Sequence, residues 1–385
     1  MGIRIDFRGK IRSYAFPARL EGELIALFED NVDRVISRSR RSRNALSIKT
    51  QEYRLLNVCA AVRELRQEGG YAVESPWSIR NKHVQWLVDN WVRKGQTAGT
   101  IENKLTYLRA MAEFMNKPYL VKTLAEYGDR TEHGLVRHYV AQEDKSWSGN
   151  GIDIDAKIKE IERTDEWVGV QLRLMWLFGL RVEESAKLQP GVAVRGGMLH
   201  VERGTKGGRK REVLIDMPET QYPLLARAAS LANPRTGSTT PTDYTLDQWM
   251  SHFYEVLRKH GLVRKVTGCT AHGLRHEYLQ GLYQRSTGDA APVKRGARLA
   301  SREVHEEGQR VVARAAGHSR PTKSNAYLST YAVQERLSKP VVKPGQAALA
   351  LAAANGNKSH AALALGISRR SLYRLLDSYA AGDQS

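Results

Sequence analysis

Four short motifs, far apart in the sequence, carry groups that could together act on a phosphate ester. Paired arginines can bind phosphate oxygens through their planar forks, histidine and lysine can move protons, and a tyrosine hydroxyl can attack phosphorus. The motifs are GLRVEES, GTKGGRKRE, HGLRH and GHSRPTKSNAYLSTY. The candidate residues in them are Arg181, Lys206, His272, Arg275, His318 and Tyr327.

Each motif alone also has an ordinary structural interpretation. Arg181 and Glu184 fit a salt bridge at a helix end, and GTKGGRKRE fits a basic surface turn. His272 and Arg275 are three residues apart, so they share one helix face and fit a partly buried polar pair. Pro321 suits the first turn of a helix. The argument for chemistry therefore depends on the combination and its order.

In chain order the set is an arginine at a helix end, a lysine on a β-hairpin, His-x-x-Arg, Gly-His, and a tyrosine nine residues after that histidine. This ordered set resembles the tyrosine recombinase family, the phage-type integrases. The resemblance covers about residues 155–335, and more weakly the family's helical core-binding domain over 48–145. It implies that the six candidate residues form one active site. The interval between the two histidine motifs is longer than in the family, and residues 286–307 are expected to form a polar, basic loop near DNA.

The chemistry that the resemblance implies has clear physical requirements. The pentavalent transition state gains negative charge, which Arg181 and Arg275 are expected to stabilise. Ionising a tyrosine hydroxyl at pH 7 costs about 4 kcal/mol, which a cationic site with His272 as base is expected to offset. Lys206 is expected to protonate the leaving 5′-oxygen, and His318 to donate a hydrogen bond to phosphate. A phosphotyrosyl ester conserves the bond energy, so neither ATP, a metal nor any other cofactor is expected.

Two tyrosines compete for the role of nucleophile. Tyr327 lies nine residues after His318, which is the family's register. Tyr331 lies one turn later and is expected on the same helix face. The register favours Tyr327, with Tyr331 packing beneath it. Glu184 is expected to orient its neighbours rather than to touch DNA.

Hydrophobic spacing and two polar stretches, KSWSGNGID and SKPVVKPG, divide the chain into four expected parts. Helical stripes begin at Ser47, with Thr97 or Thr100 as a helix cap; MLHVER and REVLID are expected strands. The fold class is therefore mainly α with a small β-sheet or hairpin, and the resemblance implies a clamp around DNA. The parts are a basic N-terminal segment (1–47), a helical core-binding domain (48–150), a catalytic domain (151–340) and a helical tail (341–385).

The charge balance favours a polyanionic partner. Lys and Arg outnumber Asp and Glu by 60 to 41, a net charge of +19, and nucleic acid is the first candidate. The run RVISRSRRSR fits phosphate contacts and a solvated helix face equally well. No apolar run approaches the roughly 20 residues of a membrane span. Cys59 and Cys269 are expected as buried thiols. We expect a cytoplasmic, nucleoid-associated protein without a membrane partner.

The tail from residue 348 resembles the helix-turn-helix of the nucleoid protein Fis and related regulators. Gly366 fits the turn and Ser368 fits the cap of the second helix. The resemblance implies that the second helix faces a major groove through Arg369, Arg370, Tyr373 and Arg374. A helical hairpin for subunit contact is the alternative.

The leading interpretation is a site-specific recombinase that cuts and rejoins double-stranded DNA through a 3′-phosphotyrosine and a Holliday junction. Its expected partners are specific recombination sites, three further copies of the chain on paired sites, and accessory DNA-bending proteins; the free protein is expected to be a monomer. The alternatives are a type IB topoisomerase and a DNA-binding regulator with a decayed catalytic domain. The helical domain ahead of the catalytic one favours recombination, and the intact six-residue set argues against decay.

Overall fold

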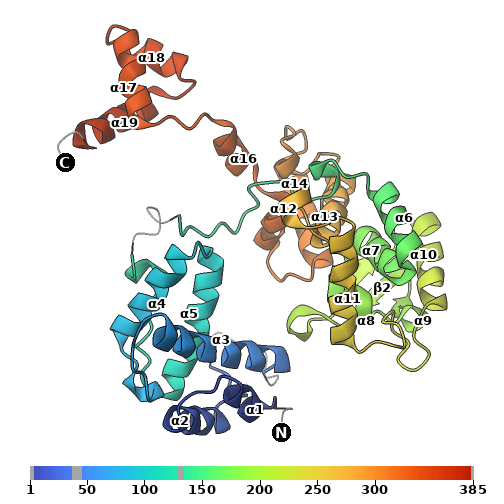
Figure 1. The fold of residues 1–385 in the computed structure, drawn as a ribbon. Coiled ribbons are helices and arrows are strands. Elements are labelled where there is room, and N and C mark those ends of the chain that lie inside the picture. Colours follow the sequence, from blue (N-terminus) through green and yellow to red (C-terminus); the bar gives the residue numbers. More distant parts are fainter. Residues whose placement is uncertain (1–3, 37–45, 129–133, 383–385) are drawn as a thin grey trace. The chain divides into compact units, whose positions relative to one another are not determined.

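The computed structural model describes residues 4–36, 46–128 and 134–382 (Figure 1). Contacts between residues divide the chain into two compact units, Met1–Arg137 and His138–Ser385. Most of the basic run RVISRSRRSR, with Arg38, Arg40, Arg41 and Arg43, lies outside the described residues. Across the described residues no helix is long and apolar enough to cross a membrane.

All regular secondary structure in the described residues of the first unit is helical. The expected stripe on the long helix α3 is confirmed, because Leu55, Cys59 and Val62 are fully buried. Of the two candidate caps, Thr97 is the one used: its Oγ1 accepts a hydrogen bond from the backbone N of Thr100 at 3.3 Å. The elements are α1 (Phe7–Arg12), α2 (Ala18–Glu29), α3 (Ile48–Gln67), η1 (Pro76–Ser78), α4 (Asn81–Arg93), α5 (Ala98–Phe114) and η2 (Leu124–Glu126).

The N-terminal segment differs from the expected lead-in. Helices α1 and α2 belong to the core of the first unit, and Ile11, Leu20, Leu24 and Phe28 are fully buried. Phe28 packs edge-on against Phe114 of α5, with ring centroids 5.9 Å apart. The four-residue spacing of Leu20, Leu24 and Phe28 is the sequence signal for this helix. The high charge of the segment obscures it.

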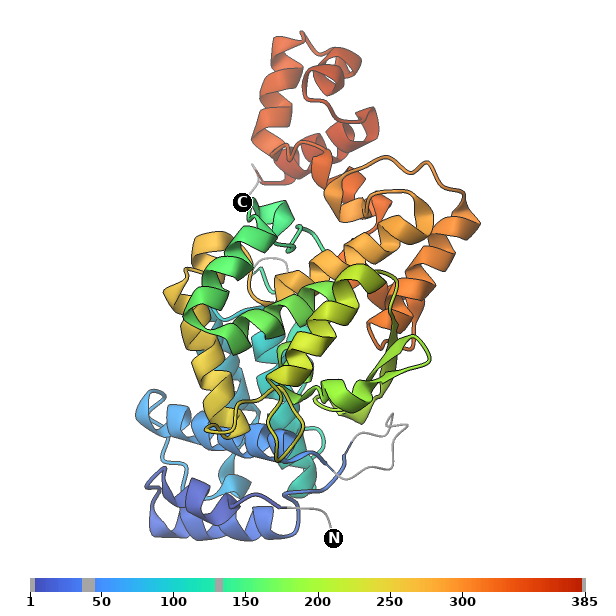
Figure 2. The same cartoon turned by 90° about the vertical axis from the view of Figure 1, so that its right-hand side faces the viewer.

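The second unit carries the expected small sheet among its helices (Figure 2). Strands β1 (Val194–Arg195), β2 (Met198–Val201) and β3 (Arg211–Leu214) are antiparallel in the order β1-β2-β3, and Val201 pairs with Arg211. A 3₁₀ turn, η4 (Lys206–Gly208), closes the β2–β3 hairpin. The predicted fold class, mainly α with a small sheet, is confirmed. The predicted strands are confirmed by β2 and β3, whereas the sequence did not predict β1.

The helices of the catalytic part surround one hydrophobic core. Helix α7 packs against α6, α10 and α13, so the turns that end and begin these helices are fixed relative to one another. The elements are η3 (Ser148–Asn150), α6 (Ile154–Thr164), α7 (Glu166–Phe178), α8 (Val182–Lys187), α9 (Pro190–Ala193), α10 (Pro218–Ser230), α11 (Leu246–Lys259), α12 (Arg264–Thr267), α13 (His272–Thr287), η5 (Pro292–Lys294), α14 (Arg302–Ala315), η6 (Pro321–Ser324), α15 (Asn325–Leu328) and α16 (Tyr331–Ser338).

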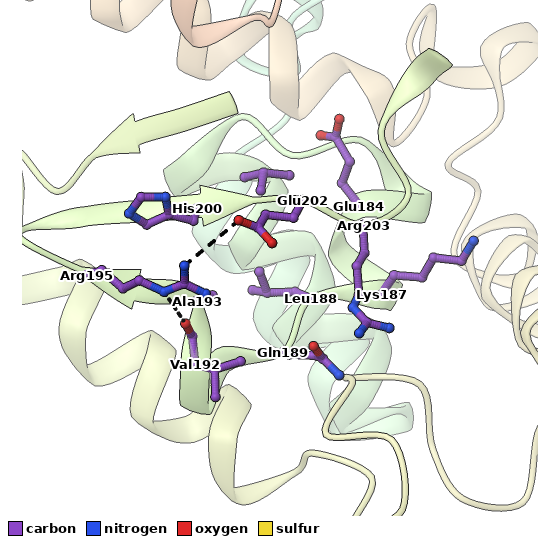
Figure 3. Close-up of a pocket in the computed structure, with 11 residues that line it drawn as sticks. Glu184, Lys187, Leu188, Gln189, Val192, Ala193, Arg195, His200, Glu202 and Arg203 are labelled. Carbon is purple, nitrogen blue, oxygen red and sulfur yellow. Dashed lines mark hydrogen bonds and ion pairs between the residues drawn. The ribbon is translucent and has the colours of Figure 1, made fainter. Parts of the chain in front are cut away.

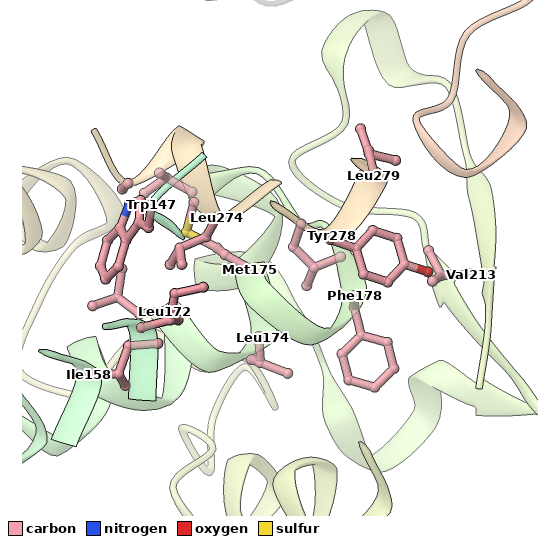
Figure 4. Packing of buried hydrophobic residues seen from close by; sticks show 14 of the residues in the cluster. Trp147, Ile158, Leu172, Leu174, Met175, Phe178, Val213, Leu274, Tyr278 and Leu279 are labelled. Carbon is pink, nitrogen blue, oxygen red and sulfur yellow. The ribbon is translucent and has the colours of Figure 1, made fainter. Parts of the chain in front are cut away.

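The stretch KSWSGNGID is part of this core and not the linker that its composition suggests. Trp147 is fully buried, and Figure 4 shows it beside side chains of α6, α7 and α13. Its Nε1 donates a hydrogen bond to the carbonyl oxygen of Thr270 at 2.9 Å, while Ser148 Oγ donates to Glu277 at 2.7 Å. A tryptophan inside a Ser/Gly-rich stretch buries a large apolar area. That residue outweighs the turn signals around it.

The segment 286–307 is also more ordered than the expected loop. Ala291 and Val293 are buried in the catalytic core at 1% and 4% exposure. The buried Asp289 accepts hydrogen bonds at its Oδ2 from the backbone N of Leu299 and Ala300, each at 3.0 Å. From Arg302 the chain is already helical in α14. The expectation of a polar loop across the whole stretch is therefore wrong.

The tail forms a small three-helix arrangement with its own core of Ala347, Ala361, Ala362 and Leu372. It consists of α17 (Pro344–Ala353), α18 (Lys358–Ala364) and α19 (Arg369–Gly382). Gly366 has a φ of 63° in the turn between the last two helices. Ser368 Oγ accepts a hydrogen bond from the backbone N of Ser371 at 3.1 Å. The predicted turn and cap are confirmed.

Candidate active site

The first candidate arginine is positioned by a glycine turn between two helices. Helix α7 ends at Phe178, and Gly179 follows with a φ of 59°. A Cβ on Gly179 would lie 2.4 Å from Cδ1 of Tyr278, so both the backbone angle and the packing require glycine. Arg181 is the N-cap residue of α8. It therefore lies at a helix end, as expected, and this end is the start of α8.

A buried carboxylate lies at the centre of the arginine cluster. Glu184 is fully buried and accepts hydrogen bonds from the backbone N of Arg181 at 2.8 Å, from the Arg181 guanidinium, and from Arg211 Nη2 at 2.6 Å. Burial alone would raise the pKa of Glu184, but the charges and hydrogen bonds of the arginines outweigh it and lower the pKa to about 2. Glu184 is thus ionised at neutral pH, and it orients its neighbours as expected.

The second candidate arginine, Arg275, lies in the first turn of α13 and is fully buried. Its Nη2 donates to the carbonyl oxygen of Ala316 at 2.7 Å, and Arg181 Nη2 donates to the same oxygen at 3.2 Å. Its Nη1 donates to the carbonyl oxygen of Gly179. Burial lowers the pKa of Arg275 to about 10, which leaves it cationic at neutral pH. Main-chain oxygens therefore hold the two arginines together.

Tyr327 meets this cluster through its hydroxyl. Its Oη accepts a hydrogen bond from Arg275 Nε at 3.3 Å, and the side chain is buried. The ring centroid lies 6.0 Å from that of His318, 6.3 Å from that of His272 and 4.9 Å from that of His276. Sequence positions far apart in the chain thus come together around one phenol.

The two candidate histidines are neutral at pH 7 in the protein alone. Burial, followed by the charges of Arg275 and Arg181, lowers the pKa of His318 to about 4. Desolvation and the charges of the same two arginines also lower the pKa of His272, and because this side chain is exposed to solvent, the two neighbouring charges are the cause on which the direction depends. A neutral imidazole beside a phenol can accept its proton, so His272 has the protonation state that a base requires.

Lys206 is not brought into the cluster. It lies exposed in η4, at the end of the β2–β3 hairpin. Within the described residues it makes no hydrogen bond or ion pair. The structure therefore unites five of the six candidate residues and leaves the sixth on the neighbouring hairpin.

Tyr331 belongs to a different cluster from Tyr327. The short helix α15 ends at Leu328, the following Ser329 has a φ of 66° that breaks the helix, and α16 begins at Tyr331. The Tyr331 ring lies 5.5 Å from that of His305, whose Nδ1 is 2.6 Å from Tyr283 Oη. The prediction that the two tyrosines share one helix face is therefore wrong.

Two residues of the site do not stand out in the sequence. Arg211 appears there only as part of the basic hairpin, yet its side chain is buried against Glu184. The signal is strand alternation, since Arg211 and Val213 share the inward face of β3. His276 stands in HGLRH with no role implied by its spacing; it is buried one turn after His272, and its Nδ1 has no hydrogen-bond partner in the described structure.

A small pocket adjoins the cluster without containing it. It has a volume of about 50 Å³, and Figure 3 shows Glu184 at its edge with Lys187, Gln189 and Arg203 around it. The volume is far below the several hundred Å³ of typical small-molecule sites. This pocket is therefore too small to enclose a typical small-molecule ligand.

The four tail residues singled out in the sequence all lie exposed on α19. Lys358, at the start of α18, lies over the Tyr373 ring at 4.7 Å. Hydrogen bonding from Arg369, followed by the Lys358 charge, lowers the pKa of Tyr373. These residues form one cationic surface, consisting of Arg369, Arg370, Tyr373, Arg374 and Lys358.

Two family models match parts of this chain. The model described as integrase matches residues 147–281, a range that includes Arg181, Lys206, His272 and Arg275. The model described as bacterial regulatory protein, Fis family, matches residues 348–379. A comparison with curated proteins found no match.

Solved structures share the fold. A lambda integrase (75–356) dimer bound to a COC′ core site is 14% identical with a TM-score of 0.51; the match covers 80% of this chain and 95% of that one. A lambda integrase tetramer bound to a Holliday junction is 14% identical with a TM-score of 0.51, over 80% and 76% of the two chains. At this identity the likeness concerns the fold. Residues 147–281 therefore match the integrase family model and residues 348–379 the Fis family model, and the chain shares its fold with lambda integrase.

Proposed function

We propose that this protein is a site-specific recombinase that cuts and rejoins double-stranded DNA through a covalent bond between Tyr327 and a 3′-phosphate. The observation that carries the proposal is the hydrogen bond from Arg275 to the Tyr327 hydroxyl, in a cluster that also holds Arg181. A phosphate bound by both arginines would lie next to that hydroxyl. The integrase match and the net charge of +19 support the same conclusion.

The proposed cleavage step involves two proton transfers, one away from the attacking tyrosine and one to the leaving 5′-oxygen. Tyr327 Oη attacks the phosphorus while its proton passes to His272, and the bond from phosphorus to the 5′-oxygen breaks. Arg181 and Arg275 stabilise the charge on the non-bridging oxygens, and His318 donates a hydrogen bond to one of them from its protonated ring nitrogen. Rejoining is the reverse step with a different 5′-hydroxyl. The bond energy stays in the ester.

Lys206 completes the proposal as the general acid for the leaving 5′-oxygen. Its exposed position in η4 is compatible with this role if DNA phosphates draw the hairpin over the site. We expect Lys206→Ala to slow cleavage strongly, and a substrate with a bridging 5′-sulfur to restore most of the rate, because a thiolate leaves without protonation. Single-turnover rates on both substrates measure this. Lys210→Ala is the matched control, since this exposed lysine of the same hairpin pairs with Glu202 at 3.2 Å. No sulfur rescue of Lys206→Ala would remove the role from Lys206.

The proposed partners are specific sites in double-stranded DNA and three further copies of the chain on paired sites. The lambda integrase structures are a dimer on a core site and a tetramer on a Holliday junction. By analogy, the helical first unit and the catalytic part of the second unit would clamp DNA, and a monomer would assemble into a tetramer only on its sites. The protein would then work in the cytoplasm, at the nucleoid. Sequencing the DNA that the purified protein retains covalently tests the proposal, and plasmid relaxation without paired sites would favour a type IB topoisomerase instead.

The tail is proposed as a second element that binds DNA. A chain ending at Lys343, just before α17, should still form the Tyr327 adduct on a short core site. It should bind longer site DNA more weakly. The slope of the logarithm of DNA affinity against the logarithm of salt concentration should become shallower by about one for each phosphate that the tail no longer neutralises. Footprinting and salt titration of both forms measure this. In the full-length chain, the double variant Arg370→Ala/Arg374→Ala should reproduce part of the effect. Identical footprints and slopes would instead make the tail an element that binds protein.

A further inference from the structure

Arg211 is a buried arginine outside the six candidate residues, and both of its terminal nitrogens have partners, whereas its Nε has none in the described structure. Its side chain is 3% exposed. Nη1 donates to the carbonyl oxygen of Ala315 at 2.8 Å, and Nη2 donates to Gly179 O at 3.3 Å and to Glu184 Oε2 at 2.6 Å. These partners lie at the end of α14, in the α7–α8 turn and in α8. A buried cation requires such pairing, so Arg211 ties three elements to strand β3.

The charges of the cluster give this bonding a specific consequence. Three guanidinium groups, those of Arg181, Arg211 and Arg275, surround the single carboxylate of Glu184. Arg275 Nη1 lies 3.8 Å from Glu184 Oε2, farther than Arg211 Nη2 at 2.6 Å. Arg211 therefore provides much of the positive charge that balances the carboxylate. Without it, Glu184 would attract Arg181 and Arg275 more strongly and compete with any phosphate bound to them.

Arg211 also supports the turn before His318. Gly317 has a φ of 70°, and a Cβ on it would lie 3.0 Å from Arg211 Cδ. The backbone of Gly317 thus lies directly over the aliphatic part of the Arg211 side chain. A shift of Arg211 would move the turn that presents His318. The Arg211 side chain therefore contacts both Glu184 and the turn that precedes His318.

We propose that Arg211 is a positioning residue of the active site: it binds Glu184 and thereby leaves Arg181 and Arg275 available to the substrate phosphate. Arg275 contacts the Tyr327 hydroxyl, whereas the guanidinium of Arg211 is bonded to Glu184 and main-chain oxygens, so we expect Arg211 to act through Glu184 and not on the phosphate. This inference rests on the proposed function, because the substrate phosphate belongs to that proposal.

The test is a double-mutant cycle between Arg211 and Glu184. Arg211→Met should lower the single-turnover rate of adduct formation by about 100-fold, an effect comparable to the loss of one transition-state hydrogen-bond donor. DNA affinity should change little, because Arg211 does not reach DNA. Adding Glu184→Gln should restore the rate by about tenfold, since the competing carboxylate charge is then gone. Arg211→Lys, which keeps the charge but not the fork, should lie between wild type and Arg211→Met.

A purely structural role predicts another pattern. The two substitutions would then lower the rate additively, or the double variant would be slower than Arg211→Met, and either result would overturn the proposal. Arg195→Met is the matched control, because this arginine of the same sheet is 59% exposed and pairs with Glu202 at 3.9 Å. It should leave the rate near that of wild type.

The stability of the DNA-free protein provides a readout that does not depend on recombination. Arg211→Met should lower the melting temperature, and Glu184→Gln in that background should raise it again, because an unpaired buried carboxylate destabilises the fold. A further decrease would refute the Arg211–Glu184 coupling. If the wild-type protein forms no adduct but the melting temperatures show the Arg211–Glu184 coupling, the proposed function is wrong while the pairing of these two charges is supported.

Discussion

Tyr327→Phe is expected to abolish covalent attachment to DNA while leaving DNA binding nearly intact. The substitution removes only the hydroxyl oxygen that accepts from Arg275 at 3.3 Å. The ring keeps its neighbours, which include His318 at 6.0 Å between centroids. Removing the acceptor of the buried Arg275 Nε costs about 1–3 kcal/mol of stability, which is less than the stability of a typical domain, so the variant should fold. Nicked suicide substrates, which trap the adduct by releasing the cleaved strand, give the measurement under denaturing electrophoresis.

Tyr331→Phe is the matched control for this variant. Tyr331 lies with His305 and Tyr283 and begins a separate helix. We expect its loss to leave adduct formation in place. Adducts that persist in Tyr327→Phe, or that disappear only in Tyr331→Phe, would show that the register to His318 identifies the wrong nucleophile.

Arg181→Ala is expected to slow adduct formation by about 10²–10³-fold at saturating DNA. The Arg181 side chain is 22% exposed, and its guanidinium donates hydrogen bonds to Glu184 and to the carbonyl oxygen of Ala316. It can therefore turn one edge to a phosphate while the protein fixes the other. The loss should appear in the rate of the chemical step more than in DNA affinity, because the charge that it stabilises develops in the transition state.

The choice of Arg181 over Arg275 separates chemistry from folding. Removing the fully buried Arg275 would also leave the carbonyl oxygen of Gly179 without this donor, and breaking buried charge pairs costs about 3–5 kcal/mol. Arg310→Ala is the matched control for Arg181→Ala, since this arginine of α14 is 49% exposed. A cleavage rate for Arg181→Ala equal to that of Arg310→Ala would exclude Arg181 from the transition state.

The sequence is sufficient for those parts of the site that lie within short motifs. His272 and Arg275 share the first turn of one helix, so their spacing alone predicts their common face. Arg211 shows the limit. Its burial follows from the packing of β3 against residues more than a hundred positions later, such as Ala315. A basic hairpin sequence contains no information about which cation points inward until the register of the strands is known.

The errors in the fold have a similar cause. Turn-forming composition predicts a linker around Trp147, and basic composition predicts a lead-in around Leu20 and Leu24. In both places a few apolar side chains gain more by burial than the polar residues lose. The reverse holds for the tail, where the turn at Gly366 and the cap at Ser368 are local and therefore predictable.

Gly179, Ala315 and Ala316 hold the arginine cluster through their main-chain carbonyl oxygens, which accept hydrogen bonds from Arg275 and Arg211. No codon change removes a carbonyl group, so a point mutation can affect these oxygens only by moving the backbone that carries them. Selection at Ala316, which is fully buried, acts on volume and backbone shape and not on polarity. A mutational scan of Ala315 and Ala316 should therefore rank amino acids by size, whereas Gly179, with a φ of 59°, should tolerate no other residue. Insertions and deletions nearby should be far more damaging than any exchange among small residues at Ala315 or Ala316.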